Sequence, residues 1–161
     1  MMKVKIYSDG ACKGNPDGPG GYGTLLQYVD SDNNLHEKEF TAGYKATTNN
    51  RMELMGVIKG FESLKAKCEV EVISDSKYVC DAFNQKWIYS WMKNGWKKSN
   101  KEPVKNKELW ERLLKAMEGH KVTFSWIKGH AGHLENERCD HLASTSAKGT
   151  KLLDDDGLSM L

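Results

Sequence analysis

The spacing of apolar residues divides the chain into short strands and longer helices. Apolar and polar residues alternate in short runs that end at turn-forming residues, which predicts strands at 4–7, 22–29, 35–42, 70–73 and 122–127. Apolar residues recur every three or four positions elsewhere, which predicts helices at 49–67, 77–83, 87–94, 106–118 and 135–147. Thr48 or Asn49, Ser76 and Asn106 stand where N-caps belong. The predicted order is three strands, one helix, one strand, three helices, one strand and one helix.

This order predicts an α/β fold with one mixed five-stranded sheet flanked by helices. The first three strands form an antiparallel meander, because a polar turn at 30–34 joins two of them as a hairpin. The crossover through residues 49–73 is expected to be right-handed and to place the fourth strand parallel to the first. We expect one domain over residues 1–147. Residues 148–161 lack periodicity and are expected to form a flexible tail.

Length and composition support a single water-soluble domain. The chain has 161 residues, of which 39% are hydrophobic and 29% charged, a balance that suits a globular protein and disfavours a disordered one. No apolar stretch approaches the length that spans a bilayer, and residues 1–10 do not resemble a secretory signal. We therefore expect a cytoplasmic protein without a membrane partner. The four cysteines form no CxxC pair and are expected to be reduced.

Four acidic residues are predicted to converge. Asp9 and Asp75 end two neighbouring parallel strands, Glu53 lies early in the following helix, and Asp140 lies in the last helix. Two unit charges 4 Å apart repel by roughly 4 kcal/mol at an effective dielectric of 20, so such a cluster requires a counter-charge. Oxygen ligands favour Mg²⁺ or Mn²⁺, and two such ions can promote phosphodiester hydrolysis. From spacing alone, each acid could instead serve a turn, a helix cap or a solvated face.

Several longer motifs resemble type 1 ribonuclease H. They occur in the family's order over roughly residues 3–146: SDGAC at 8–12, GNP at 14–16, GPGGYG at 18–23, TTNNRMEL at 47–54, SDS at 74–76, GWK at 95–97 and KGHAGHLENERCDHLA at 128–143. The resemblance implies the ribonuclease H-like fold and an endonuclease that hydrolyses the RNA strand of RNA–DNA hybrids. It also implies two-metal-ion catalysis with Mg²⁺, or Mn²⁺ as a substitute, and products with 5′-phosphate and 3′-hydroxyl ends.

The resemblance also assigns roles to the acidic residues. Asp9 would bridge both ions, Asp140 would help hold the ion at the nucleophilic water, and Glu53 with Asp75 would hold the ion at the leaving 3′ oxygen. His130 lies in a glycine-containing loop where a histidine can transfer a proton near neutral pH, and the resemblance makes it functional.

A zinc site is an alternative for the last part of the chain. His130, His133, Cys139 and His141 have a spacing that could suggest zinc ligands. However, Cys139 and His141 are two residues apart on a predicted helix and face different ways, which argues against zinc.

Substrate contacts follow from the resemblance and from one basic segment. Residues 86–107 carry seven lysines and one acid, so this segment is +6 in a chain of net charge +2 and suits a polyanion. By resemblance it is the basic handle that grips the DNA strand, with Trp87, Trp91, Trp96, Lys97 and Lys98; we expect its tryptophans mostly to pack and its lysines to bind phosphates. The resemblance assigns recognition of the RNA 2′-hydroxyl to Cys12 (through its backbone), Asn15, Asn49, Asn50 and Glu53, and a DNA phosphate contact to Thr48.

Three positions depart from the family pattern. The glycine-rich loop is one residue longer than the commonest form, Lys77 stands where many relatives have Gln, and Ala46 stands where Arg is common. These changes affect expected substrate affinity and leave the four acids intact. Two other functions fit the same motifs: another nuclease on this fold, such as a resolvase or DNA exonuclease, and a catalytically silent hybrid-binding module. We expect the hybrid-specific endonuclease to be a monomer.

Overall fold

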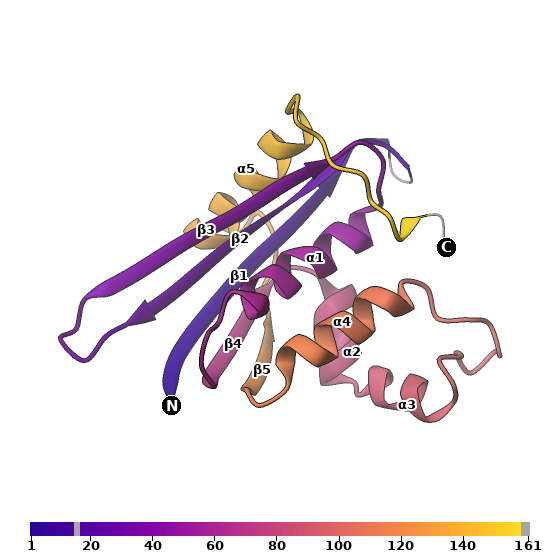
Figure 1. Ribbon diagram of the computed structural model, residues 1–161, viewed down its shortest axis with the longest axis horizontal. Helices are drawn as coiled ribbons and strands as arrows, with labels where there is room; N and C mark the ends of the chain where they lie inside the picture. The colour runs from indigo at the N-terminus through magenta and orange to yellow at the C-terminus, as the bar shows by residue number, and fades with distance from the viewer. Residues whose placement is uncertain (15–16, 159–161) are drawn as a thin grey trace.

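A single mixed sheet organises the molecule. The computed structural model describes residues 1–14 and 17–158 (Figure 1). The sheet has the strand order β3-β2-β1-β4-β5, which confirms the predicted architecture. The strands are β1 (Met2–Cys12), β2 (Gly20–Val29), β3 (Leu35–Tyr44), β4 (Cys68–Ser74) and β5 (Lys121–Trp126). The helices are α1 (Asn49–Glu62), α2 (Lys77–Asn84), α3 (Trp87–Lys93), α4 (Lys107–Met117) and α5 (Leu134–Ala147).

The strand directions bring the ends of β1 and β4 together. β1 pairs antiparallel with β2 and parallel with β4, as predicted, and β4 pairs parallel with β5. Ser8 lies opposite Ser74 in the parallel ladder. Asp9 and Asp75, the next residue of each segment, therefore reach the same edge of the sheet.

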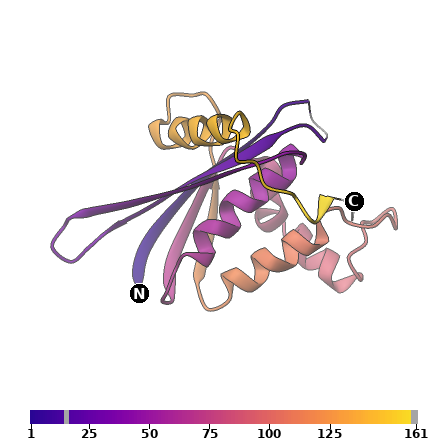
Figure 2. The ribbon, with the colours of Figure 1, turned by 45° about the horizontal axis from the view of Figure 1, so that its top comes forward.

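Helices cover both faces of the sheet. Alternate residues of β1 point to opposite sides: Ile6 belongs to the main core beneath α1 and α4, whereas Tyr7 packs with Leu25 and Cys139 beneath α5 (Figure 2). α5 lies unusually close to β2, because a Cβ added at Gly23 would stand 2.2 Å from the carbonyl oxygen of Cys139. Within the described residues no helix is both long and apolar enough to cross a membrane.

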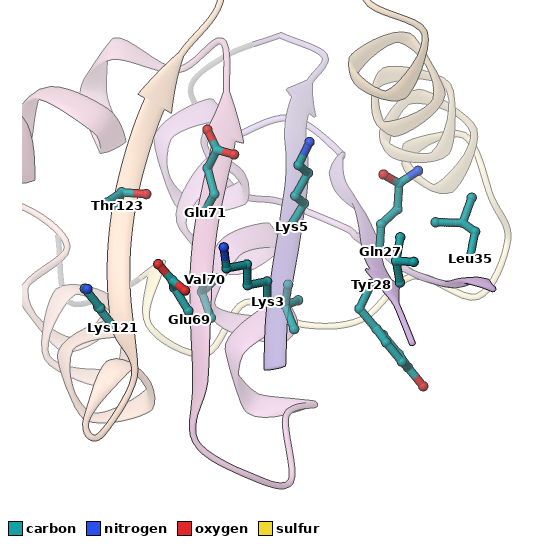
Figure 3. A pocket seen from close by; sticks show the side chains of 12 residues that line it. Lys3, Lys5, Gln27, Tyr28, Leu35, Glu69, Val70, Glu71, Lys121 and Thr123 are labelled. Atoms are coloured by element: carbon teal, nitrogen blue, oxygen red, sulfur yellow. The ribbon is translucent and has the colours of Figure 1, made fainter. Parts of the chain in front are cut away.

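Part of the α5 face of the sheet stays uncovered and is highly charged (Figure 3). In the ladder register Lys3 of β1 lies opposite Glu69 of β4, and Glu69 lies opposite Lys121 of β5. Lys5 and Glu71 repeat the β1–β4 pairing two residues further on. Opposite charges on neighbouring strands stabilise such a face in water, so this half of the sheet needs no covering helix.

Two local predictions are corrected by the structure. α1 ends at Glu62, five residues before the predicted end, where the Ser63 N–H donates to the carbonyl of Lys59. Asn106 precedes α4 as predicted but makes no capping hydrogen bond with its side chain. Its amide instead donates to the Tyr78 hydroxyl at 3.0 Å and accepts from Arg51 at 3.1 Å. Tertiary partners have taken the polar atoms that a local cap would use.

The end of the chain makes specific contacts with the rest of the fold. Residues 152–158, within the segment expected to form a tail, lie along the end of β3 and the start of α1 (Figure 1). The Leu153 N–H donates to the Gly43 carbonyl at 2.8 Å, and the Lys45 N–H donates to the Leu153 carbonyl at 2.9 Å. These are specific polar contacts without apolar periodicity, which a search for periodic patterns does not detect.

Candidate active site

Three carboxylates from three elements meet at the edge of the sheet. Asp9 lies in β1, Asp75 follows β4, and Glu53 lies in the second turn of α1. One oxygen from each lies within 4.8 Å of the others. Thr48 caps α1 by accepting a hydrogen bond from the N–H of Arg51, as predicted, which fixes where the helix begins and directs Glu53 inward.

Glycines allow the backbones around these carboxylates to approach closely. A Cβ at Gly10 would lie 2.6 Å from the backbone nitrogen of Glu53, so only glycine lets α1 pack this near β1. A Cβ at Gly129 would lie 2.5 Å from Oδ2 of Asp75, so the loop after β5 passes directly beside that carboxylate. The glycines of the recognised motifs therefore set the distances within the site.

Burial and mutual repulsion make these carboxylates weaker acids than usual. Burial raises the pKa of Asp9 to about 8, and the charges of Asp75 and Asp140 add to the shift. Burial also raises the pKa of Glu53 well above its ordinary value, with the charge of Asp9 as the second cause. The pKa of Asp75 is raised as well, mainly by burial. The protein alone therefore holds this cluster in an unfavourable electrostatic state.

The cluster fits a hard divalent cation. Oε2 of Glu53 is buried without a hydrogen-bond partner, which is costly unless something else binds it. All three side chains offer only oxygen, the ligand type of Mg²⁺ and Mn²⁺. Within the described residues these three form the one His/Cys/Asp/Glu group with metal-binding spacing. Cys139, considered above as a zinc ligand, is fully buried beside Tyr7 and Leu25.

Asp140 and His130 lie at the rim of the cluster. Asp140, half-buried on α5, lies near enough to Asp9 for its charge to help raise the pKa of that carboxyl. His130 is exposed, adopts a left-handed backbone with φ of 56°, and lies near enough to Asp75 for its charge to lower the pKa of that carboxyl. The structure thus brings together all five residues that the sequence assigns to catalysis, with Asp140 outside the tight group of three.

The predicted RNA-recognition residues surround the start of α1. The Sγ of Cys12 lies 3.4 Å from the Thr47 carbonyl, next to the Thr48 cap. Asn49 and Asn50 occupy the first turn of α1, where Asn50 is exposed. Asn15 lies outside the described residues. Glu53, the remaining member of this group, lies on the same helix, three positions after Asn50.

The basic handle consists of α3 and the loop that follows it. Trp91 packs edge-on against Trp110 with ring centroids 5.6 Å apart, and Trp96 also contacts the core. Trp87 is 47% exposed, so the expectation that the tryptophans mostly pack is wrong for this residue. Lys97 and Lys98 are exposed, as phosphate-binding side chains must be.

Trp126 is a site residue that the sequence did not reveal. Its indole N–H donates to the backbone carbonyl of Asp75 at 2.9 Å, and the Lys77 ammonium lies 4.8 Å from its ring centroid. Lys77 therefore lies over the ring of a tryptophan that is hydrogen-bonded to the backbone of Asp75. A tryptophan at the end of a predicted strand carries no sequence signal of this role, because the contact depends on the pairing of β4 with β5.

Comparisons with known proteins agree with this geometry. The family model "RNase H" matches residues 1–148. The "Ribonuclease H" of Lachnoclostridium phytofermentans is 59% identical over 154 residues, covering 96% of this chain and 98% of that protein. The "Ribonuclease H" of Klebsiella pneumoniae subsp. pneumoniae is 52% identical over 154 residues, covering 96% and 95%.

Two solved structures extend the comparison to the fold. LC9-RNase H1, described as a type 1 RNase H with the type 2 active-site motif, superposes with a TM-score of 0.82 at 34% identity, covering 91% of this chain and 72% of that one. LC11-RNase H1, solved in complex with an RNA/DNA hybrid, superposes with a TM-score of 0.66 at 26% identity, covering 89% of this chain and 96% of that one.

Proposed function

The chain belongs to the ribonuclease H family, and we propose that it is an endonuclease that hydrolyses the RNA strand of RNA–DNA hybrids, giving 5′-phosphate and 3′-hydroxyl ends. The main support for this proposal is the buried cluster of Asp9, Glu53 and Asp75. Without a bound cation, burial and mutual repulsion make the ionised form of these carboxylates unfavourable. The LC11-RNase H1 structure with an RNA/DNA hybrid supports the choice of substrate.

We assign two Mg²⁺ ions to the carboxylates. Asp9 would contribute to both ions, Asp140 to the ion on the side of the attacking water, and Glu53 with Asp75 to the ion on the side of the leaving oxygen. When bound, such ions lower the pKa of water and stabilise charge on phosphate oxygens. The unpartnered Oε2 of Glu53 supports its assignment as a ligand.

The remaining residues bind the duplex and handle protons. His130, exposed on the loop beside Asp75, can accept or release a proton at the scissile phosphate. Lys97 and Lys98 on the basic handle neutralise phosphates of the DNA strand, and exposed Trp87 packs against its sugar-phosphate backbone. Lys77, two residues after Asp75 and over the Trp126 ring, is expected to make a further contact with the substrate.

The RNA strand is distinguished by its 2′-hydroxyl groups, which both donate and accept hydrogen bonds. Cys12 through its backbone, Asn49, Asn50 and Glu53 are assigned to this recognition, and Thr48 to a phosphate of the DNA strand. The N-cap and first turn of α1 supply Thr48, Asn49 and Asn50, Cys12 lies next to Thr47 just before them, and Glu53 follows in the second turn. Asn15 belongs to the same assignment by its position in the glycine-rich loop. We also expect the enzyme to be a cytoplasmic monomer.

An end-labelled hybrid tests the proposal directly. The hybrid is incubated with and without Mg²⁺, alongside single-stranded RNA, duplex RNA and duplex DNA, and the product ends are identified by ligation and phosphatase treatment. Metal-dependent cleavage confined to the RNA strand of the hybrid is the expected result. Asp9→Asn is expected to abolish cleavage, and Asp32→Asn, at the exposed tip of the β2–β3 hairpin, serves as the control. Cleavage of duplex DNA, or binding without cleavage, contradicts the proposal.

A further inference from the structure

The C-terminal segment, residues 152–158, docks on the part of the fold that carries the RNA-recognition residues. Its backbone pairs with Gly43 and Lys45 through Leu153 at the end of β3. In Figure 1 this yellow segment runs from α5 past the end of β3 toward the start of α1 and the start of α4. It thereby brings the side chain of Asp155 to the loop before α1.

Asp155 binds both the loop before α1 and α1 itself. One carboxylate oxygen, Oδ2, accepts hydrogen bonds from Thr47 Oγ1 at 2.6 Å and from Arg51 Nε at 2.7 Å, and Oδ1 accepts from Arg51 Nη2 at 2.9 Å. The side chains of Arg51 and Asp155 are only 1% and 9% exposed. Hydrogen bonds between such buried, charged groups are short and strong, and they hold one geometry.

Thr47 connects Asp155 to the glycine-rich loop. The Thr47 N–H donates to the Gly18 carbonyl at 3.0 Å, and its own carbonyl accepts from the Asp17 N–H at 2.8 Å. The same carbonyl lies 3.4 Å from Sγ of Cys12. Thr47 is therefore the point where the glycine-rich loop, the loop before α1 and the C-terminal segment meet, and its hydroxyl is bound by Asp155.

We infer that Asp155 is a positioning residue for recognition of the RNA strand, an inference that rests on the proposed function. It touches no reacting group; it fixes Thr47, and through Thr47 the relative placement of Cys12 and the Thr48–Asn50 turn. Groups that read a 2′-hydroxyl must be held within a fraction of an ångström to form good hydrogen bonds. A carboxylate supplied from the end of the chain provides that restraint.

The other contacts of Arg51 allow a positioning role of Asp155 to be distinguished from a contribution to overall stability. Arg51 also binds Glu108 at 2.6 Å and Asn106 at 3.1 Å, so its buried charge keeps partners on α4 when Asp155 is changed. The Thr47 hydroxyl, in contrast, loses the acceptor described above. Thr47→Val consequently removes only the link to the recognition loops and leaves the Arg51–Asp155 pair in place.

The test compares Asp155→Asn and Thr47→Val with two matched controls. Asp154→Asn removes the neighbouring carboxylate, which is 75% exposed and forms only a 3.5 Å surface pair with Lys45. Thr47→Ser keeps the hydroxyl. We measure kcat and KM for a hybrid at a temperature where circular dichroism shows each variant folded, and affinity for hybrid and duplex DNA without divalent metal.

Asp155→Asn and Thr47→Val are expected to raise KM by about fivefold, the equivalent of about 1 kcal/mol, and to lower the preference for hybrid over duplex DNA by a similar factor. In both variants kcat is expected to stay within about twofold, and the two controls are expected to match the wild type. Unchanged KM and selectivity in folded variants would overturn the inference while leaving the proposed function standing. Absence of hybrid cleavage by the wild type would instead refute the proposed function itself.

Discussion

Replacing Asp9 with Asn is expected to stabilise the metal-free protein while abolishing its activity. In the folded chain burial raises the pKa of Asp9 to about 8, whereas a carboxyl in the unfolded chain ionises near 3.8. Between about pH 4 and pH 8 Asp9 is ionised in the unfolded chain. On folding it must either take up a proton or keep its charge in a buried site, and both lower the free energy of unfolding. The free energy of unfolding should fall as pH rises through this range, since the unfolded chain binds fewer protons.

The size of the expected stabilisation follows from the raised pKa of Asp9. One pKa unit is equivalent to 1.36 kcal/mol, so the span from 3.8 to pH 7 sets an upper limit of about 4 kcal/mol on the cost of Asp9 at neutral pH. Repulsion from Asp75 and Asp140 is part of that cost, and a neighbouring carboxyl that takes up a proton relieves it. We therefore expect Asp9→Asn to raise the free energy of unfolding by about 2–4 kcal/mol at pH 7.

Urea unfolding in EDTA at pH 5 and pH 7 measures this effect. The gain in Asp9→Asn should shrink toward pH 5, and added Mg²⁺ should stabilise the wild type more than the variant, because the cation offsets the same repulsion. Asp32→Asn, on the exposed hairpin tip, controls for loss of a charge. Equal stability of wild type and Asp9→Asn at both pH values would refute the reasoning, since it would mean that neither burial nor the neighbouring carboxylates make the charge of Asp9 costly in the folded chain.

Three further predictions concern other parts of the molecule. Gly23→Ala should lower the free energy of unfolding by about 3 kcal/mol in urea titrations, because its Cβ would lie 2.2 Å from a backbone oxygen of α5; an unchanged midpoint would contradict this close packing. His130→Ala should lower kcat by roughly tenfold to hundredfold in steady-state assays without abolishing cleavage, and complete loss would make His130 an indispensable base. The double change of Lys97 and Lys98 to Ala should reduce the log–log salt slope of hybrid binding by about 2, as two lost phosphate contacts require; an unchanged slope would place the DNA strand elsewhere.

Much of the fold was predictable because its signals are local. The hairpin turn at 30–34, the Thr48 cap and the helical spacing after it each depend on residues that are neighbours in sequence. The crossover rule then places β4 beside β1 from handedness alone, which is enough to bring Asp9 and Asp75 to one edge. The motif resemblance added the individual roles of the four acids and the substrate contacts.

The features that could not be predicted depend on partners distant in sequence. Asn106 has a side chain of the type that caps helices, yet its amide is hydrogen-bonded to Tyr78 and Arg51 instead. Trp126 supports Asp75 and Lys77 only because β4 and β5 are adjacent.

The C-terminal segment shows most clearly the difference between local sequence signals and contacts between distant residues. Residues 148–158 have no apolar periodicity, so nothing local distinguishes them from a flexible tail. Asp155 is fixed because folding buries the charge of Arg51, 104 positions away in sequence, and a buried cation requires a carboxylate partner. The sequence by itself determined the strands, the helices and the four acids, since periodicity, capping and motif spacing are local properties. Only the tertiary structure decided how close the acids lie, how their burial raises their pKa values and which side chains hold the recognition loops, because burial and long-range pairing exist only once the chain is folded.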